Sequence, residues 1–203
     1  LSRALGVEEC VSVRIERRIP SGGGLGSSSA DAGSVLRALA ERWDVDPLDQ
    51  RVVDVARRVG ADVAFFLNPV PSLLRGAGDV LENTFPVLGG VPLALVMPAD
   101  CASSTREVYE EFDRVPTAPE SPDALCDTLA RGDVPGVAAH LYNNLAPAAL
   151  RLKPAMGEPA AWLAQQSGVI ASQITGSGSC SFAICESASG AERIARAAEN
   201  EHG

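Results

Sequence analysis

The chain has 203 residues, of which 46% are hydrophobic and 21% charged, and its formal net charge at pH 7 is −9. This composition is typical of a globular protein of one or two domains and excludes a disordered chain. The negative charge argues against nucleic acid and anionic membranes as partners, because both select basic faces. No apolar run reaches the roughly 20 residues that cross a bilayer. The five cysteines form no CxxC pair, so we expect reduced thiols in a cytoplasmic protein.

A segment rich in glycine and serine lies near the start of the chain. The alternating run at 10–16 before it predicts a strand, and the helical spacing of apolar residues after it predicts a helix at 29–43. Glycines between a strand and a helix let consecutive N–H groups face one anion, at the positive end of the helix. The alternative is a flexible linker before a serine-capped helix. The candidate phosphate-binding residues are Pro20, Gly22, Gly23, Gly24, Leu25, Gly26, Ser27, Ser28 and Ser29.

Further elements are predicted in chain order. A helix is expected at 48–59, with Asp46-Pro47 as its start signal and Gly60 as its stop signal. The run at 86–92 contains two glycines and two prolines and predicts a domain junction. The other expected elements are short strands up to Gly78, a buried strand at 93–97, a helix from Ser104, a loop at 116–122, helices at 123–131, 133–151 and 155–167, strands at 169–174 and 180–185, and a C-terminal helix.

Several motifs resemble those of the GHMP small-molecule kinases, in the same order along nearly the whole chain. Residues 20–32 resemble the second signature motif of that superfamily, and their Ser-Ala-Asp-Ala ending is most similar to the 4-diphosphocytidyl-2-C-methyl-D-erythritol kinase family. The other matching segments are 60–67, 75–79, 103–109, 143–145 and 175–182. The resemblance implies an α+β fold. It consists of a partial N-terminal ATP-binding domain over 1–88, like domain 2 of ribosomal protein S5, and a ferredoxin-like αβ domain over 89–203.

The resemblance also implies an activity. It is ATP-dependent phosphorylation of the C2 hydroxyl of a cytidyl-linked methylerythritol, a step of non-mevalonate isoprenoid (terpenoid) biosynthesis. The glycine-rich segment would hold the phosphates of ATP, Ser29 would contact Mg²⁺, and Asp62 would be the catalytic aspartate. Gly176 and Gly178 would form a loop near the phosphates and the substrate. Each residue has a structural alternative, because Ser29 and Asp62 also suit helix caps, and Gly176 and Gly178 suit a plain hairpin turn.

One departure from the family pattern concerns lysine. The family carries a Pro-Ala-Lys-Leu-Asn motif in a long stretch before the glycine-rich segment, whereas here Leu1 opens the chain and Lys153 is the only lysine. We therefore expect the C-terminal two thirds of a kinase, which binds nucleotide weakly and transfers phosphate slowly or not at all. Two other functions stay open: a GHMP kinase for another acceptor, such as homoserine or mevalonate, and a catalytically silent nucleotide-binding module.

Overall fold

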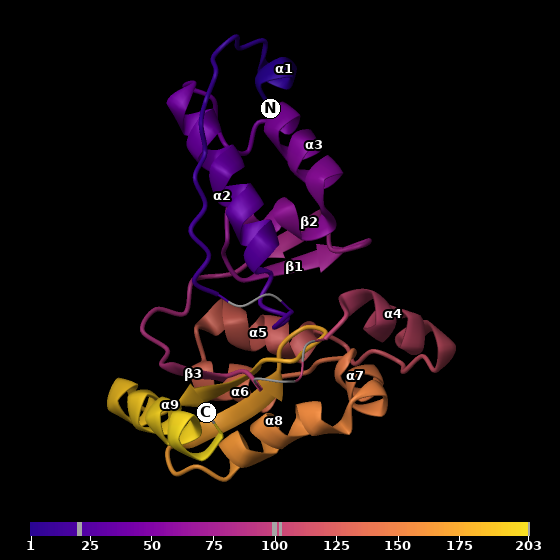
Figure 1. The fold of residues 1–203 in the computed structure, drawn as a ribbon, viewed down its shortest axis with the longest axis vertical. Coiled ribbons are helices and arrows are strands. Elements are labelled where there is room, and N and C mark those ends of the chain that lie inside the picture. The colour runs from indigo at the N-terminus through magenta and orange to yellow at the C-terminus, as the bar shows by residue number, and fades with distance from the viewer. Residues whose placement is uncertain (20–21, 99–100, 102, 203) are drawn as a thin grey trace. The chain divides into compact units, whose positions relative to one another are not determined.

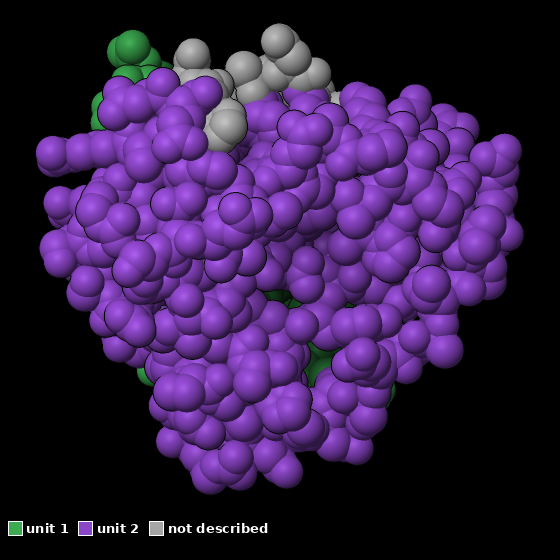
Figure 2. Space-filling view, turned by 90° about the horizontal axis from the view of Figure 1, so that it is seen from below, with its two compact units in different colours: residues 1–19, 26–87 green, residues 20–25, 88–203 purple. Residues whose placement is uncertain are grey.

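The computed structural model describes residues 1–19, 22–98, 101 and 103–202 (Figure 1). They form two compact units (Figure 2). Unit 1 comprises Leu1–Ile19 and Gly26–Val87, and unit 2 comprises Pro20–Leu25 and Leu88–Gly203. The chain therefore passes from one unit to the other inside the glycine-rich segment, between Leu25 and Gly26. The predicted domain boundary between residues 88 and 89 stays a prediction.

Unit 1 consists of two main helices, a pair of single-turn 3₁₀ helices and a β-hairpin. Its elements are α1 (Ser2–Leu5), α2 (Ser27–Arg42), α3 (Gln50–Val59), η1 (Ala61–Val63), η2 (Phe65–Leu67), β1 (Ser72–Arg75) and β2 (Val80–Thr84). Strands β1 and β2 pair antiparallel. The apolar faces of α2 and α3 pack on η1 and η2, in a core formed by Leu36, Ala40, Val52, Ala56, Val63 and Leu67. This core joins the end of the glycine-rich segment to the turn that carries Asp62.

The predicted helices of unit 1 are confirmed with shifted ends. Helix α2 begins two residues before the predicted start. Helix α3 begins later than predicted because Asp49 is its N-cap, and the Asp49 side chain accepts a hydrogen bond from the Arg51 backbone N–H at 2.9 Å. Gly60 ends α3 as predicted.

The predicted strand at 10–16 is wrong. Residues 7–18 have no regular secondary structure, and the three apolar side chains that suggested a buried face are exposed: Val11 by 42%, Val13 by 52% and Ile15 by 54%. A strand needs a neighbour for its backbone N–H and C=O groups. None of the strands in the described part of the chain pairs with this segment.

Unit 2 contains a three-stranded antiparallel sheet in the order β3-β5-β4. Its elements are β3 (Leu93–Val96), α4 (Thr105–Arg114), α5 (Asp123–Arg131), α6 (Val134–Ala139), α7 (Ala146–Leu152), η3 (Pro154–Met156), α8 (Gly157–Ala164), β4 (Val169–Ile174), β5 (Ser181–Cys185) and α9 (Ala188–His202). Helices α8 and α9 cover one face of the sheet (Figure 1), where Leu163 and Ile194 pack on Ala94 and Ala183. The predicted α+β class is confirmed.

Three predictions for unit 2 need correction. Strand β3 is not buried on both faces: Ala94 and Val96 on one face are buried, whereas Leu93 and Leu95 on the other face are about half exposed. The single helix predicted at 133–151 is two helices, because Pro147 begins a new helix in the first turn of α7. The helix predicted at 155–167 also begins later, at Gly157, after the 3₁₀ turn η3. None of the described helices is long and apolar enough to span a membrane.

Candidate functional site

The glycine half of the glycine-rich segment is held inside unit 2 by the loop that joins β4 and β5. Three hydrogen bonds dock residues 22–24 on this loop: from Ser179 N to Gly22 O (3.2 Å), from Cys180 N to Gly23 O (3.2 Å) and from Thr175 Oγ1 to Gly24 O (2.9 Å). The segment is therefore not a flexible linker there. Pro20, another predicted phosphate-binding residue, lies outside the described residues.

The two backbones approach so closely that side chains are excluded. Gly24 has φ +70°, and a Cβ atom there would lie 2.2 Å from Thr175 O and 2.9 Å from Gly178 O. A Cβ atom on Gly176, at φ +52°, would lie 3.1 Å from Gly24 O. Gly176 and Gly178 thus lie in the turn between β4 and β5, and this turn packs against residues 22–24. Their predicted place beside the phosphates and the substrate stays a prediction.

Side chains from two other parts of unit 2 hold the same loop. Ser103 Oγ donates to Ser177 O at 2.7 Å, and the Thr105 and Ser177 hydroxyls lie 3.0 Å apart. Asn143 contacts the base of the loop through its side-chain amide. These residues lie in family-like segments, and no role was predicted for them. Ser103 and Thr105 flank the predicted helix start at Ser104, whereas Asn143 lies inside the helix predicted at 133–151 and had no local signal.

The serine half of the segment begins helix α2 in unit 1. Gly26 is the N-cap with φ +64°, and the first helical hydrogen bond runs from Ala30 N to Gly26 O at 2.9 Å. The N–H groups of residues 27–29 therefore have no acceptor within the helix. Their hydroxyls make no hydrogen bond to any residue that the structure describes. The cap alternative for Ser29 is wrong, because Ser29 lies in the first turn of the helix. This turn is a suitable site for an anion.

Asp62 lies in η1, on the exposed side of unit 1. Its carboxylate makes no hydrogen bond or ion pair with the described residues, and it caps neither η1, whose N-cap is Gly60, nor η2, whose N-cap is Ala64. The cap alternative for Asp62 is therefore wrong as well. Asp62 Oδ1 lies 3.8 Å from the place where a Cβ atom on Gly78 would stand, so the β1–β2 turn lies beside the carboxylate.

Phe66 packs the segment that carries Asp62 onto helix α2. A Cβ atom on Gly33 would lie 2.4 Å from Phe66 Cβ, and one on Gly26 would lie 3.3 Å from Phe66 Cζ. The absence of side chains at both glycines lets η2 approach the first two turns of α2. One contact within unit 1 thus positions both the serine half of the glycine-rich segment and the Asp62 turn.

The donors fit a magnesium ion that is bound mainly by phosphate. Among the described residues, no group of three or more His, Cys, Asp or Glu side chains could hold a metal ion. Mg²⁺ commonly takes one or two protein oxygens and fills its other positions with water and substrate phosphates. The Ser29 hydroxyl has no partner among the described residues, and its contact with Mg²⁺ stays a prediction.

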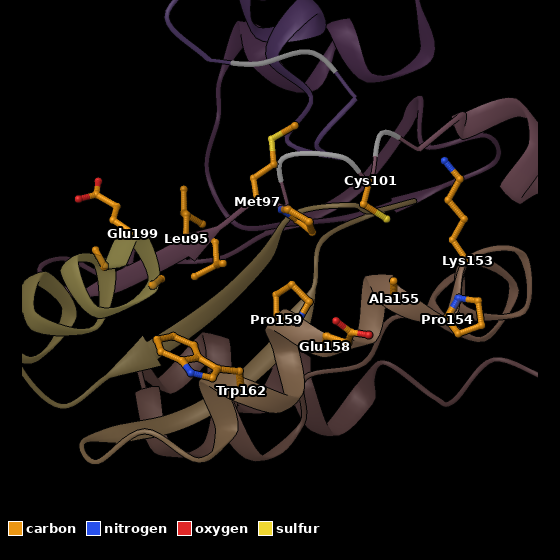
Figure 3. Close-up of a pocket in the computed structure, with 14 residues that line it drawn as sticks. Leu95, Met97, Cys101, Lys153, Pro154, Ala155, Glu158, Pro159, Trp162 and Glu199 are labelled. Atoms are coloured by element: carbon orange, nitrogen blue, oxygen red, sulfur yellow. The ribbon is translucent and has the colours of Figure 1, made fainter. Parts of the chain in front are cut away.

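A pocket of about 810 Å³ lies elsewhere in unit 2 (Figure 3). Leu95 and Met97 from the β3 edge, Trp162 from α8 and Glu199 from α9 line it, and Lys153 lies at one end. Of the predicted site residues that the structure describes, none is among those that line the pocket. Met97 connects the pocket to the glycine-rich segment, because its Sδ atom lies 3.2 Å from the place where a Cβ atom on Gly23 would stand.

Comparisons with known proteins decide the family. Residues 1–68 match the family model of the GHMP kinases N terminal domain, and residues 125–203 match that of the GHMP kinases C terminal. A relative from Gloeobacter violaceus, named 4-diphosphocytidyl-2-C-methyl-D-erythritol kinase, is 30% identical over 208 residues, which cover 100% of this chain and 68% of the relative. The chain belongs to the GHMP kinase family.

Two further comparisons support this membership. The relative of the same name from Nocardioides sp. is 36% identical over 195 residues, which cover 94% of this chain and 64% of the relative. The crystal structure of 4-(cytidine 5'-diphospho)-2C-methyl-D-erythritol kinase matches with a TM-score of 0.71 at 32% identity, covering 91% of this chain and 65% of that one. The chain spans slightly less than two thirds of both proteins. The predicted family and GHMP fold are confirmed, whereas the roles of the predicted site residues stay predictions.

Proposed function

We propose that this GHMP kinase transfers the γ-phosphoryl group of ATP to the C2 hydroxyl of 4-diphosphocytidyl-2-C-methyl-D-erythritol. The observation that carries the proposal is the first turn of α2, where three backbone N–H groups and three serine hydroxyls have no partner among the described residues. Such a turn binds phosphate through its free donors and the helix dipole. The acceptor alcohol is inferred from the names of the relatives.

The glycine-rich segment would hold the β- and γ-phosphates. Residues 27–29 donate their N–H groups and hydroxyls, and residues 22–24 keep a fixed backbone through their bonds to the β4–β5 loop. Mg²⁺, when bound beside the Ser29 hydroxyl, neutralises charge that develops on the phosphate oxygens. The contribution of these groups is positioning and electrostatic stabilisation, because phosphoryl transfer requires little covalent chemistry from the protein.

Asp62 would act on the acceptor. Its exposed carboxylate has no partner among the described residues, so it is free to accept a hydrogen bond from the C2 hydroxyl. As the hydroxyl oxygen bonds to the γ-phosphorus and the bond to the ADP oxygen breaks, the hydroxyl proton passes to the Asp62 carboxylate.

A second function is nucleotide binding without transfer. Lys153 is the only lysine of the 203 residues, and it lines the pocket of unit 2. A kinase site without a lysine near the phosphates has fewer positive charges to stabilise the transition state. Turnover distinguishes the two functions, whereas nucleotide binding is common to both.

Calorimetric titration with Mg-ATP, and separately with the cytidyl-linked methylerythritol, tests the proposal. We expect the wild-type chain to bind Mg-ATP and Ser29→Ala to bind it about tenfold more weakly, the effect of losing one charge-assisted hydrogen bond. Ser34→Ala is the matched control, because Ser34 is an exposed residue of the same helix. Binding with ³¹P-detected transfer to the methylerythritol supports the kinase, and binding without transfer supports the silent module. A folded chain that binds no Mg-ATP contradicts both functions.

A further inference from the structure

Asn143 lies between α6 and α7, inside the range where a single helix was predicted. Its side-chain amide makes three hydrogen bonds: both N–H donors are used, and the oxygen accepts once. Nδ2 donates to Ile174 O and to Gly176 O, both at 2.8 Å, and Oδ1 accepts from Leu145 N at 3.0 Å. Asn143 thus joins its own backbone turn to the base of the β4–β5 loop.

The two carbonyl groups that Asn143 binds flank Thr175. Thr175 donates its hydroxyl to Gly24 O at 2.9 Å, and Gly176 lies so close to Gly24 that a Cβ atom on it would be 3.1 Å from the same oxygen. The Asn143 amide therefore holds the loop on both sides of the residue that holds Gly24. These contacts all lie within unit 2.

We propose that Asn143 is a positioning residue of the nucleotide site: it fixes the β4–β5 loop, the loop fixes residues 22–24, and the affinity for the ATP phosphates depends on that arrangement. The residue acts through Gly176 and Thr175, without touching the nucleotide itself. The part of the inference that concerns ATP rests on the proposed function, whereas the docking of residues 22–24 does not.

The next residue supplies a matched control. Asn143 must donate twice, because it faces two carbonyl oxygens, and a carboxylate there would repel both. Asn144 mainly accepts: its Oδ1 receives the Thr117 hydroxyl at 2.6 Å and the Tyr142 hydroxyl at 2.7 Å, while its Nδ2 reaches Thr117 O only at 3.4 Å. A carboxylate retains both accepted bonds at position 144. The same change of amide to carboxylate should therefore be harmful at position 143 and tolerated at position 144.

The first experiment measures amide hydrogen exchange in wild type, Asn143→Asp and Asn144→Asp, without any ligand. The amides of Ser179 and Cys180 report the docking directly, because they donate to Gly22 O and Gly23 O. We expect their exchange to be at least tenfold faster in Asn143→Asp and unchanged in Asn144→Asp. Equal exchange in the two variants would overturn the positioning role.

The second experiment titrates the same three proteins with Mg-ATP. We expect the Kd to rise at least tenfold in Asn143→Asp and to stay at the wild-type value in Asn144→Asp. Faster exchange with an unchanged Kd overturns the link between the loop and the nucleotide. If even wild type binds no Mg-ATP, the proposed function fails and so does that link, whereas the exchange result still decides the docking.

Melting temperatures measured over a series of pH values distinguish the loss of the Asn143 hydrogen-bond donors from a general loss of packing. A carboxyl group placed at position 143 donates a hydrogen bond to a carbonyl oxygen only in its protonated form. We therefore expect the difference in melting temperature between Asn143→Asp and Asn144→Asp to narrow as the pH falls. A constant difference contradicts the donor role. Should Asn143→Asp not fold at neutral pH, Asn143→Ala removes the donors without adding charge and is measured by the same exchange of Ser179 and Cys180.

Discussion

Thr175 and Gly24 are separated by 151 positions in the sequence, and the Thr175 hydroxyl donates to the Gly24 carbonyl oxygen at 2.9 Å. Gly24 accepts this bond with φ +70° and has no room for a side chain. The conformation of the glycine-rich segment is therefore set by a loop near the other end of the chain. A nucleotide that binds the segment would also depend on that loop.

Gly24→Ala should destabilise unit 2 and weaken Mg-ATP binding, because its Cβ would lie 2.2 Å from Thr175 O. Gly90→Ala is the control: Gly90 has nearly the same φ, +72°, but nothing lies within 4 Å of its Cβ position. Both variants carry the left-handed backbone cost of about 1–2 kcal/mol, and only Gly24→Ala adds the clash. Thermal melts and calorimetry measure the difference. Equal effects of the two substitutions would mean that the close contact does not exist in solution.

Asp62→Asn should lower turnover by about 10²- to 10⁴-fold, the usual contribution of a general base. The melting temperature and the Kd for Mg-ATP should stay at their wild-type values, because the Asp62 carboxylate makes no hydrogen bond to the described residues. Asp113→Asn removes another exposed carboxylate, on α4, and should leave all three quantities unchanged. Single-turnover assays by ³¹P NMR suit a slow enzyme. Turnover that survives in Asp62→Asn rules out the catalytic role.

Gly33→Ala should destabilise unit 1 by about 1–3 kcal/mol, the typical cost of overpacking a core. The new Cβ would lie 2.4 Å from Phe66 Cβ and 3.1 Å from Val63 O, which would push η1 and η2 away from α2. Gly190→Ala in α9 should instead be neutral or stabilising, because only the flexible Ser187 hydroxyl lies near its Cβ position, at 3.1 Å. Urea unfolding followed by circular dichroism measures both. A stabilised Gly33→Ala variant would refute the close packing of Phe66 on α2.

Asp49 should make the stability of unit 1 sensitive to acid. Hydrogen bonds from the Arg51 side chain and backbone lower the pKa of the Asp49 carboxyl to about 2. Because this pKa lies below the unfolded value of about 3.9, the carboxylate stabilises the fold above roughly pH 4, and its contribution is lost as the pH falls through about 2. Asp49→Asn should therefore melt lower than wild type at pH 6, and the difference should vanish near pH 2. Melting temperatures whose difference stays constant over that range would contradict the ion pair.

Most helices were predictable because their signals are local. Gly60 ends α3, Ser104 caps α4 through a bond to Glu107 N, and the helix predicted at 123–131 has those bounds in the structure. A cap or a stop signal acts within one turn of its own residue, so a single sequence suffices to find it. Local signals were insufficient at 10–16. The alternation of apolar residues predicted a strand there, but no described strand pairs with this segment.

The sequence by itself determined the family, the glycine-rich segment and the residue types that can hold phosphate. Only the tertiary structure decided that Ser29 and Asp62 are not caps, that Gly24 lies against Thr175, and that Asn143 holds the loop between β4 and β5. The physical reason is the distance along the chain over which each effect acts. Backbone propensity and capping act over a few residues, whereas these contacts depend on hydrogen bonds and close packing between segments that only the folded chain brings together.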